Sequence, residues 1–585
     1  MKISQFVHLA MIPASLAASA GALAQSTPAT ATPIQHVVVL FQENVSFDHY
    51  FGTYPNAQNN SGEQAFTAYP GTPTVNGLSP ALLNQNPNLN AGGTSKVNPG
   101  RLSPAQAYTC SNNHSYGPEQ QAVDGGLLDK FPKYTGSTTA VGCAADGSTV
   151  LGYFDGNTVA AYWNYAQNYA LNDNSFDSNF GPSSTGVINL LSGQTYYANT
   201  FFGSGSTSSY PTNTVTGSGS YVTDIGDFDA YLDDCGNDKG GTSTGTTTLQ
   251  MTSKSVGDLL NAAGVTWGWF QGGFRPTTAA SGSSPAVCGA SRIEHEYPST
   301  YPSAGNGNSP YFVPEPVAPL NTSSSTVHTA TNDYVSHHAG FQFYASTRNQ
   351  HHLGPTSVAA IGTTDRANHQ YDTRDFFDAL AAGNLPAVSF IKAPAAYNGH
   401  PGNSDPISEQ YWVTQVINTI MQSPAWATTA IIIAYDDSDG WYDHVTGPVV
   451  SPSNVSVDYL AGSSNCGTPV SGAQLGRCGH GPRLPLLVIS PYANPNYVDH
   501  TLTNQASIIN FIEANWNLGY IDGPAAPASG TGSYDRYSGT LLNMFNFNAP
   551  PTTQPLLLTC SGAYASTPAQ ACQIDPSEID PPGTF

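Results

Sequence analysis

Residues 34–52, IQHVVVLFQENVSFDHYFG, decide the fold of this chain. The apolar, β-branched run at residues 37–41 has no alternating polar face, which predicts a strand buried inside a parallel sheet. Glu43 and Asn44 follow at its carboxyl end, where open α/β sheets bind their ligands. Both side chains offer hard oxygen atoms, which suit a divalent cation. The alternative is that Asn44 caps a helix and Glu43 is simply exposed.

A second stretch, TAIIIAYDDSDGWYDHV at residues 429–445, repeats the pattern. Residues 430–435 predict another buried strand, with Asp436 and Asp437 at its carboxyl end, on the same edge of the sheet as Glu43. Two adjacent carboxylates repel each other, and a divalent cation removes that cost. A solvated acidic turn is the other interpretation. Further strands at residues 385–392 and 482–493, and helices at 159–170, 375–382, 407–422 and 504–516, complete an α/β pattern.

A third stretch, GPSSTGVINLLSG at residues 181–193, places Ser183 at the start of a helix. The Gly-Pro pair predicts a turn, and residues 187–191 read as helical. A serine in this place is most often a cap. The same place also suits a nucleophile, because backbone N–H groups and the helix dipole favour a phosphate there.

These stretches together resemble the signature of the bacterial phosphoesterase family, which holds the non-zinc phospholipases C and a group of secreted acid phosphatases. The resemblance runs from about Ile34 to Trp516 and is carried by several separated motifs. It implies an α/β fold with an alkaline-phosphatase-like core, in which a mostly parallel sheet is flanked by helices and carries long loop insertions.

The resemblance also implies the roles of individual residues. One divalent metal ion would be held by Glu43, Asn44, Asp436 and Asp437. Ser183 would be the nucleophile, with Ser184 as the fallback. The segment NNHSY at residues 112–116, the His pair after residue 336 and the loop His after strand 385–392 would contact the substrate phosphate, through His114, His337, His338 and His400. Asp439, Asp443 and His444 would support the site, whereas His351 and His352 read as surface residues.

The implied activity is a metal-dependent phosphoric-ester hydrolase that forms a phospho-serine intermediate, acting on a phosphate monoester or a phospholipid. Two features favour the acid-phosphatase branch. Val45 stands where many phospholipases C have Arg, and the His337–His338 pair is similar to that of the phosphatase-like branch. Gly186 and Val187 stand where phospholipases C often carry Asn and Arg, so head-group contacts from those positions would be lost. A sulfatase-like hydrolase is opposed by the lack of a Cys-x-Pro-x-Arg segment near the nucleophile. An inactive secreted binding protein is opposed by competent residues at every proposed position.

The composition of the chain limits where in the cell the protein is expected and which partners it is expected to bind. Residues 1–24 read as a Sec-type export signal, which predicts a periplasmic or extracellular protein. No other run is apolar and long enough to predict a membrane span. Acidic residues outnumber basic ones 39 to 16, which opposes binding to nucleic acid and strong attraction to anionic membranes. We expect one large catalytic domain at residues 25–520, with surface loops at 203–221 and 240–248, and a C-terminal wrap at 521–585.

Eight cysteines fit an oxidising compartment, and no CxxC pair indicates a zinc or redox motif. Eight cysteines allow 105 pairings. The simplest expectation is sequential pairing: Cys110–Cys143, Cys235–Cys288, Cys466–Cys478 and Cys560–Cys572.

Overall fold

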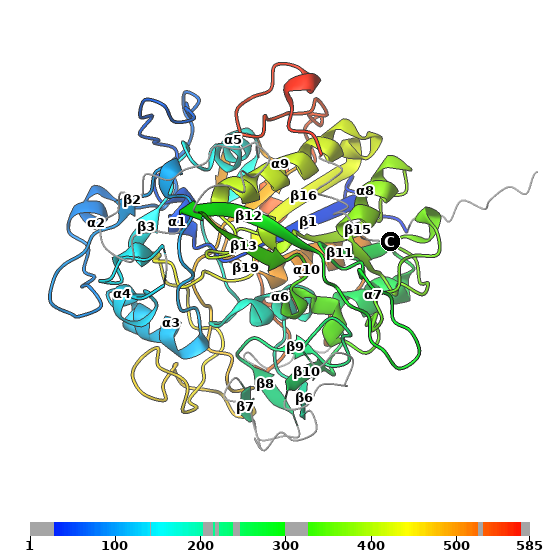
Figure 1. Cartoon of the computed structure of the whole chain (residues 1–585), viewed down its shortest axis with the longest axis horizontal. Coiled ribbons are helices and arrows are strands. Elements are labelled where there is room, and N and C mark those ends of the chain that lie inside the picture. Colours follow the sequence, from blue (N-terminus) through cyan, green and yellow to red (C-terminus); the bar gives the residue numbers. More distant parts are fainter. Residues whose placement is uncertain are drawn as a thin grey trace, which may run out of the picture.

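The chain forms an α/β fold around a mostly parallel sheet of eight strands (Figure 1). The computed structural model describes residues 28–140, 142–202, 214–216, 221–237, 246–298, 326–523 and 531–574. The predicted export signal at residues 1–24 lies outside the described residues. The predicted fold class, a mostly parallel sheet flanked by helices, is confirmed.

The strands of this sheet follow the spatial order β14, β11, β15, β1, β16, β17, β4, β18. β17 is antiparallel to both of its neighbours, and the other pairs are parallel. The bounds are β1 His36–Gln42, β4 Ala170–Asn172, β11 Trp267–Gln271, β14 Gln370–Asp372, β15 Val388–Lys392, β16 Thr429–Tyr435, β17 Leu486–Ile489 and β18 Tyr497–Asp499.

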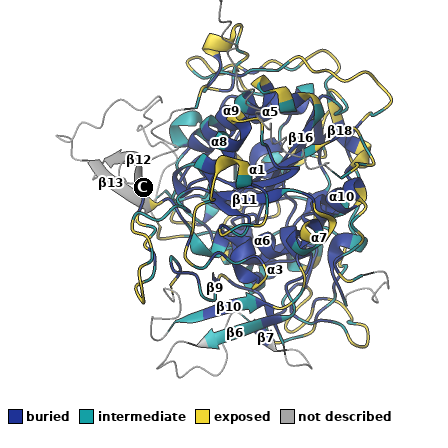
Figure 2. Cartoon of the chain, turned by 90° about the vertical axis from the view of Figure 1, so that its right-hand side faces the viewer, coloured by how far each residue is buried: buried dark blue, intermediate teal, exposed yellow. Residues whose placement is uncertain are grey.

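Helices cover both faces of the sheet, which is why the central strands are apolar without alternation. Val37, Val39 and Phe41 of β1 pack on one face with α6, α7 and α10, whereas Val38 and Leu40 pack on the other with α5, α8 and α9. Figure 2 shows this centre as almost wholly buried. The bounds are α5 Ala160–Asn168, α6 Ser183–Ser192, α7 Val256–Ala263, α8 Thr373–Ala381, α9 Pro406–Gln422 and α10 Ala506–Trp516.

The register of three central strands brings their carboxyl ends to one edge. Gln42 at the end of β1 pairs with Tyr435 at the end of β16. On the other side of β1, Leu40 pairs with Ile391, one residue before the end of β15. The residues that leave these strands are therefore neighbours in space although they are far apart in the sequence.

The expectation of plain loops at residues 203–221 and 240–248 is wrong where those segments are described. Thr214–Thr216 is strand β7 and Thr247–Met251 is strand β10 of a second sheet, ordered β7, β8, β6, β10, β9. This sheet lies at the lower edge of Figure 1. Threonine favours strands, and pairing of β10 with β6 satisfies its backbone groups. The remaining bounds are β6 Ala198–Phe202, β8 Val222–Asp224 and β9 Asp229–Ala230.

Shorter elements lie in the insertions around these two sheets. The helices are α1 Phe47–Phe51, α2 Pro80–Asn84, α3 Tyr116–Val123 and α4 Phe131–Tyr134. The strand pairs are β2 Gly100–Arg101 with β3 Gly152–Tyr153, β5 Ser175–Phe176 with β19 Thr503–Asn504, and β12 Ser291–Pro298 with β13 Thr326–Asn332.

The four sequential disulfides are confirmed: Cys110–Cys143, Cys235–Cys288, Cys466–Cys478 and Cys560–Cys572. Each adds roughly 2–4 kcal/mol of stability in the chain-entropy account. The last one closes the C-terminal segment, where Leu558 is buried in the core. Asn418 of α9 donates to the carbonyls of Leu558 and Cys572, at 2.8 and 3.0 Å. The described part of this segment is thus bound to α9 and the hydrophobic core, whereas the domain boundary at residue 520 stays a prediction.

Among the described residues, no helix combines the length and the apolar character needed to cross a membrane.

Candidate active site

Glu43, Asn44 and Asp436 meet at the carboxyl edge of the sheet, and all three are fully buried. The Asn44 backbone N–H donates to Asp436 Oδ1 at 3.1 Å, which ties the end of β1 to the end of β16. Ser46, not Asn44, caps the following helix α1. Asn44 has a φ of 55°, a left-handed conformation that asparagine adopts more readily than most residues. Neither a capping Asn44 nor an exposed Glu43 describes this site.

Whether these residues suit a cation depends on which end of the Asn44 side-chain amide, oxygen or nitrogen, faces the carboxylates. One end of the amide lies 3.1 Å from both Glu43 Oε2 and Asp436 Oδ1, and the other end lies 3.2 Å from His400 Nε2. His400 Nδ1 lies 2.7 Å from the Pro401 carbonyl oxygen, so Nδ1 carries a hydrogen. Where His400 Nε2 is an acceptor, the amide nitrogen faces it; where Nε2 carries a hydrogen, the amide oxygen faces it.

The first orientation turns Asn44 Oδ1 toward the two carboxylates. Glu43 Oε2, Asn44 Oδ1 and Asp436 Oδ1 then form a buried group of three side-chain acceptors, in which Asp436 Oδ1 also accepts from the backbone N–H groups of Asn44 and Asp437, at 3.1 and 2.9 Å. Hard oxygen donors of this kind are the ligands that divalent cations such as Mg²⁺ and Ca²⁺ prefer. The donor set therefore fits a divalent ion. In the reverse orientation, the amide nitrogen donates to both carboxylates, so Asn44 offers no oxygen to a cation there.

Asp437 contacts Ser183, the predicted nucleophile. Its Oδ2 accepts a hydrogen bond from Ser183 Oγ at 2.9 Å, and Asn44 Oδ1 lies 3.5 Å from the same hydroxyl. Asp436 and Asp437 are both fully buried, so the solvated acidic turn is excluded. Burial raises the pKa of both carboxyls, and a carboxylate neighbour adds to it, Glu43 for Asp436 and Asp436 for Asp437. Among the described residues, Asp437 belongs to no compact group of metal-ligand type, whereas Glu43 and Asp436 do.

Ser183 and Ser184 point in different directions at the start of α6. Ser184 Oγ lies 3.5 Å from the carbonyls of Phe228 and His337, away from the carboxylates. Only the Ser183 hydroxyl of this pair contacts Asp437. The N-cap residue of α6 is Pro182, so Ser183 is the first helical residue and not a cap.

The predicted phosphate cradle at the start of α6 is largely occupied by the protein itself. The Ser184 N–H donates to Asp227 Oδ1 at 3.0 Å, and the Thr185 N–H donates to the Pro182 carbonyl at 2.9 Å. Neither amide is free for a phosphate. Side chains must therefore supply most of the contacts to a substrate phosphate.

Gly186 lets α6 approach the end of β16. A Cβ atom at this position would overlap the carbonyl oxygen of Asp436. The helix that carries Ser183 therefore lies against the backbone between β16 and the carboxylates, and only glycine allows that distance.

Gly186→Ala is expected to lower turnover by about 100-fold, because a displacement of about 1 Å at a catalytic group has that cost. The melting temperature should fall as well, since overpacking costs about 1–3 kcal/mol. Steady-state kinetics and thermal unfolding would measure both effects. Gly354→Ala is the matched control, because a Cβ there meets open space. Wild-type kinetics in Gly186→Ala would contradict the close-approach argument.

The four predicted histidines surround this centre. His338 is buried and its Nδ1 lies 2.7 Å from Glu43 Oε1. His337 turns the other way, with its Nδ1 4.0 Å from Asp229 Oδ1, and is partly exposed. His114 Nδ1 lies 3.1 Å from Asp439 Oδ1, and the rings of His114 and His400 are 6.0 Å apart.

The charge state of His114 is set by carboxylates. Burial acts to lower the pKa of His114, but Asp437 and Asp439 outweigh it and raise the pKa well above the usual value. Asp439 also accepts from Ser111 Oγ and from the Asn112 backbone N–H, at 3.0 and 2.8 Å, which fixes its position. His114 is therefore protonated at neutral pH and can act as a proton donor, and Asp439 fixes its position.

Lys392, the last residue of β15, also belongs to this site, although no sequence motif singles it out. Its Nζ lies 2.5 Å from Glu43 Oε1 and 2.9 Å from Asp436 Oδ2, and its side chain is 1% exposed. Burial acts to lower the pKa of Lys392, but Asp436 and Glu43 outweigh it and raise the pKa. Lys392 could have been found from the sequence, because it stands at the carboxyl end of a predicted parallel strand, as Glu43 and Asp436 do.

Asp443 and His444 belong to an ion-pair group with Asp48 and Arg483. Arg483, which is fully buried, binds Asp48 Oδ1 at 3.0 Å and Asp443 Oδ1 at 3.1 Å. His444 Nδ1 lies 2.6 Å from Asp48 Oδ2. An arginine already compensates these carboxylates, which agrees with the structural role expected for Asp443 and His444.

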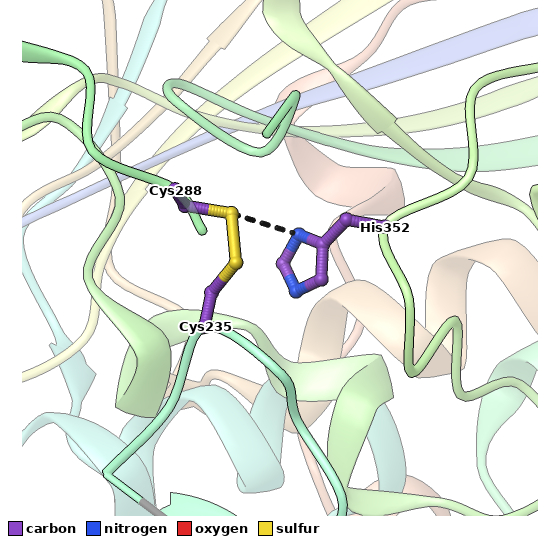
Figure 3. A group of neighbouring side chains, drawn as sticks. All are labelled: Cys235, Cys288 and His352. Atoms are coloured by element: carbon purple, nitrogen blue, oxygen red, sulfur yellow. Dashed lines mark hydrogen bonds between the residues drawn. A yellow bond between two sulfur atoms is a disulfide. The ribbon is translucent and has the colours of Figure 1, made fainter. Parts of the chain in front are cut away.

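The expectation that His352 lies at the surface is wrong. His352 is buried, and its Nε2 lies 2.7 Å from Asp233 Oδ1. Its Nδ1 faces the Cys235–Cys288 disulfide, 3.5 Å from Cys288 Sγ (Figure 3). The two sulfur atoms are bonded to each other, and metals bind the thiolate form, so this group is no metal site. His351 is half exposed, as expected.

Most of this chain is similar in sequence to known proteins. Residues 34–519 match the model of the family described as Phosphoesterase family, which is most of the chain. The non-hemolytic phospholipase C of Burkholderia pseudomallei is 26% identical over 550 residues, which cover 91% of this chain and 62% of that protein. The hemolytic phospholipase C of Pseudomonas aeruginosa is 25% identical over 540 residues, which cover 90% of this chain and 57% of that protein.

The chain thus spans about 60% of the length of these two curated relatives. A solved structure of a protein in the alkaline phosphatase superfamily from Vibrio parahaemolyticus has a TM-score of 0.25 and 11% sequence identity, and the match covers 77% of this chain and 76% of that one.

Proposed function

This chain belongs to the phosphoesterase family, and from that premise we propose that it hydrolyses phosphoric esters through a phospho-serine intermediate on Ser183, with one bound divalent metal ion. The observation that carries the proposal is the hydrogen bond from Ser183 Oγ to Asp437 Oδ2, at 2.9 Å, beside the acceptor group of Glu43, Asn44 and Asp436. A hydroxyl in such a place has both a proton acceptor and a cation-binding group as neighbours.

The side chains that would hold the metal are Glu43, Asn44, Asp436 and Asp437. When bound, the ion would lower the pKa of the Ser183 hydroxyl and draw charge from the phosphoryl oxygens. Its identity does not follow from oxygen ligands alone.

The chain's own residues account for the proton and bond changes. Ser183 Oγ attacks phosphorus, a Ser–O–P bond forms, and the hydroxyl proton passes to Asp437 Oδ2. The bond from phosphorus to the leaving oxygen breaks as His114 gives that oxygen a proton. Water then attacks the phospho-serine and gives one proton to His114, and the proton on Asp437 returns to Ser183 Oγ as the Ser–O–P bond breaks. This step releases phosphate from a monoester or a phosphorylated head group from a phospholipid. His337, His338 and His400 would hold the phosphoryl oxygens, since the helix amides are engaged elsewhere.

Phosphate monoesters are the proposed substrate class. Val45 is 1% exposed and packs in the core, and so does Val187. Gly186 lies against the Asp436 carbonyl. The positions at which phospholipases C often carry larger polar residues therefore offer no contact to a head group. This supports the acid-phosphatase branch.

Phospholipase C is the second candidate, and the similarity to two proteins of that name over 90% or more of this chain favours it. Export from the cytoplasm fits either activity, and four disulfides support it.

A model aryl phosphate and phosphatidylcholine, each assayed at acid and at neutral pH with added divalent ions, would test the proposal. We expect turnover of the aryl phosphate to exceed release of phosphocholine. Faster release of phosphocholine would select the second candidate. Preference for an aryl sulfate would indicate a sulfatase-like hydrolase, and no turnover of any ester would indicate an inactive binding protein.

A further inference from the structure

Lys392 places a permanent positive charge inside the carboxylate group of the candidate site. The ammonium lies 2.5 Å from Glu43 Oε1 and 2.9 Å from Asp436 Oδ2. It also lies 5.0 Å from the centre of the Phe41 ring. Its place is fixed by the sheet, because β15 is the parallel neighbour of β1, and the three side chains leave adjacent strand ends.

Each of the two carboxylates, Glu43 and Asp436, has one oxygen that faces Lys392 and one that faces Asn44. Glu43 Oε1 and Asp436 Oδ2 face Lys392, and His338 Nδ1 adds a third contact to Glu43 Oε1 at 2.7 Å. The opposite oxygens, Glu43 Oε2 and Asp436 Oδ1, both face the Asn44 amide at 3.1 Å. Glu43 and Asp436 therefore bridge a lysine position on one side and the candidate metal position on the other.

The lysine position has the composition of a metal site in its own right. Ligand atoms of Glu43, His338 and Asp436 lie within 4.8 Å of one another. His338 is 3% exposed, and its Nε2 has no hydrogen-bond partner within the described part of the chain. Two carboxylates and an imidazole would satisfy a divalent ion, but the ammonium stands within hydrogen-bonding distance of both carboxylates.

We propose that Lys392 occupies the second cation position of what would otherwise be a two-metal site, so that the chain takes one divalent ion instead of two. The inference rests on the proposed function, because it assumes that the Asn44 position binds a metal. Hydrolases that use two metal ions hold them about 3.5–4 Å apart with shared ligands, and Glu43 and Asp436 are shared in this way. The lysine is a positioning residue that fixes the bridging carboxylates and sets the stoichiometry.

If Lys392 had only a structural role, its removal would lower stability without changing the number of bound ions. Removing one partner of a buried ion pair destabilises a protein because charge is left unpaired. It gives no reason for a second ion to bind. The number of ions bound per chain therefore separates the two roles, and it can be measured without any activity.

The test compares three full-length proteins: wild type, Lys392→Ala, which empties the position, and Lys392→Met, which fills it with an uncharged chain of similar length. Each is dialysed against Mn²⁺, and the bound metal is counted by elemental analysis. We expect one ion in wild type and in Lys392→Met, and two in Lys392→Ala. Electron paramagnetic resonance should show an isolated Mn²⁺ in the first two proteins and an exchange-coupled pair in the third.

One ion with an unchanged spectrum in Lys392→Ala would overturn the proposal, and so would two ions in wild type. No Mn²⁺ in wild type would remove the metal premise of the proposed function as well, which distinguishes the two failures. Lys392→Asn is the second variant if Lys392→Ala does not fold, and it should also bind two ions. Failure of both variants to fold in saturating Mn²⁺ would reject the proposal, because the ion should replace the ammonium.

Discussion

Ser183→Ala should lower kcat/KM by about four to six orders of magnitude, because loss of a nucleophile from an acyl- or phosphoryl-transfer site has effects of this size. The Ser183 hydroxyl is the donor that Asp437 Oδ2 accepts from at 2.9 Å. Folding should change little, since a lost buried hydrogen bond costs roughly 1–3 kcal/mol. Steady-state kinetics on an aryl phosphate, together with thermal unfolding, would measure both quantities.

Ser184→Ala is the matched control, because it removes the same atom one residue along the helix. Its hydroxyl faces the carbonyls of Phe228 and His337 and no carboxylate, so most activity should remain. Acid quench during turnover should trap a phosphopeptide with phosphate on Ser183. Phosphate on Ser184 would move the nucleophile by one residue. No adduct, with Ser183→Ala still active, would favour direct attack by water.

The sequence predicts the sheet well because burial on both faces leaves an unambiguous signal. The apolar runs at residues 37–41 and 430–435 correspond to β1 and β16, and the positions after them hold Glu43 and Asp436. Parallel pairing then determines that these residues meet. Their separation of almost 400 residues is no obstacle, because the register of a parallel pair carries the information.

What the sequence did not predict depends on contacts between segments without a pattern of their own. His352 reads as a polar residue in a loop, and its burial follows from contacts with Asp233 and the Phe274 carbonyl, at 2.7 and 2.8 Å. Strand β7 has only three residues, Thr214–Thr216, which are too few for a sequence pattern to indicate a strand before their pairing with β8 is known. The occupied amides of α6 could not be foreseen either, since Asp227 lies 43 residues from Ser184.

Burial also changes how the metal ligands should be tested. Glu43→Ala or Asp436→Ala would remove a carboxylate from a group with no exposed surface and would leave the buried Lys392 with one carboxylate partner instead of two. Breaking a buried ion pair in this way costs about 3–5 kcal/mol. Lost activity in either variant would therefore not distinguish a missing ligand from a disturbed fold, and a test without stranded charge is needed.

Exhaustive chelation should reduce turnover of the wild-type protein by at least about 100-fold, and a divalent ion added back should restore it. The physical reason is that the ion would stabilise several kcal/mol of charge in the transition state. No side chain is altered, and Lys392 keeps both carboxylates paired, so the chain should stay folded. Circular dichroism before and after chelation would check this, alongside kinetics and elemental analysis.

Asn44→Gly is the variant that matches chelation without stranding a charge. Asn44 is neutral, and its φ of 55° suits glycine, so the backbone turn should survive while the amide oxygen is lost. We expect the variant to need at least about 10-fold more divalent ion for half-maximal activity, since even supporting residues of metal sites have effects of 10–100-fold on affinity. Half of the wild-type rate after exhaustive chelation would reject a metal-dependent mechanism. If Asn44→Gly needs no more divalent ion than wild type, Asn44 is not a ligand. That result would leave metal dependence itself intact, because chelation tests metal dependence separately.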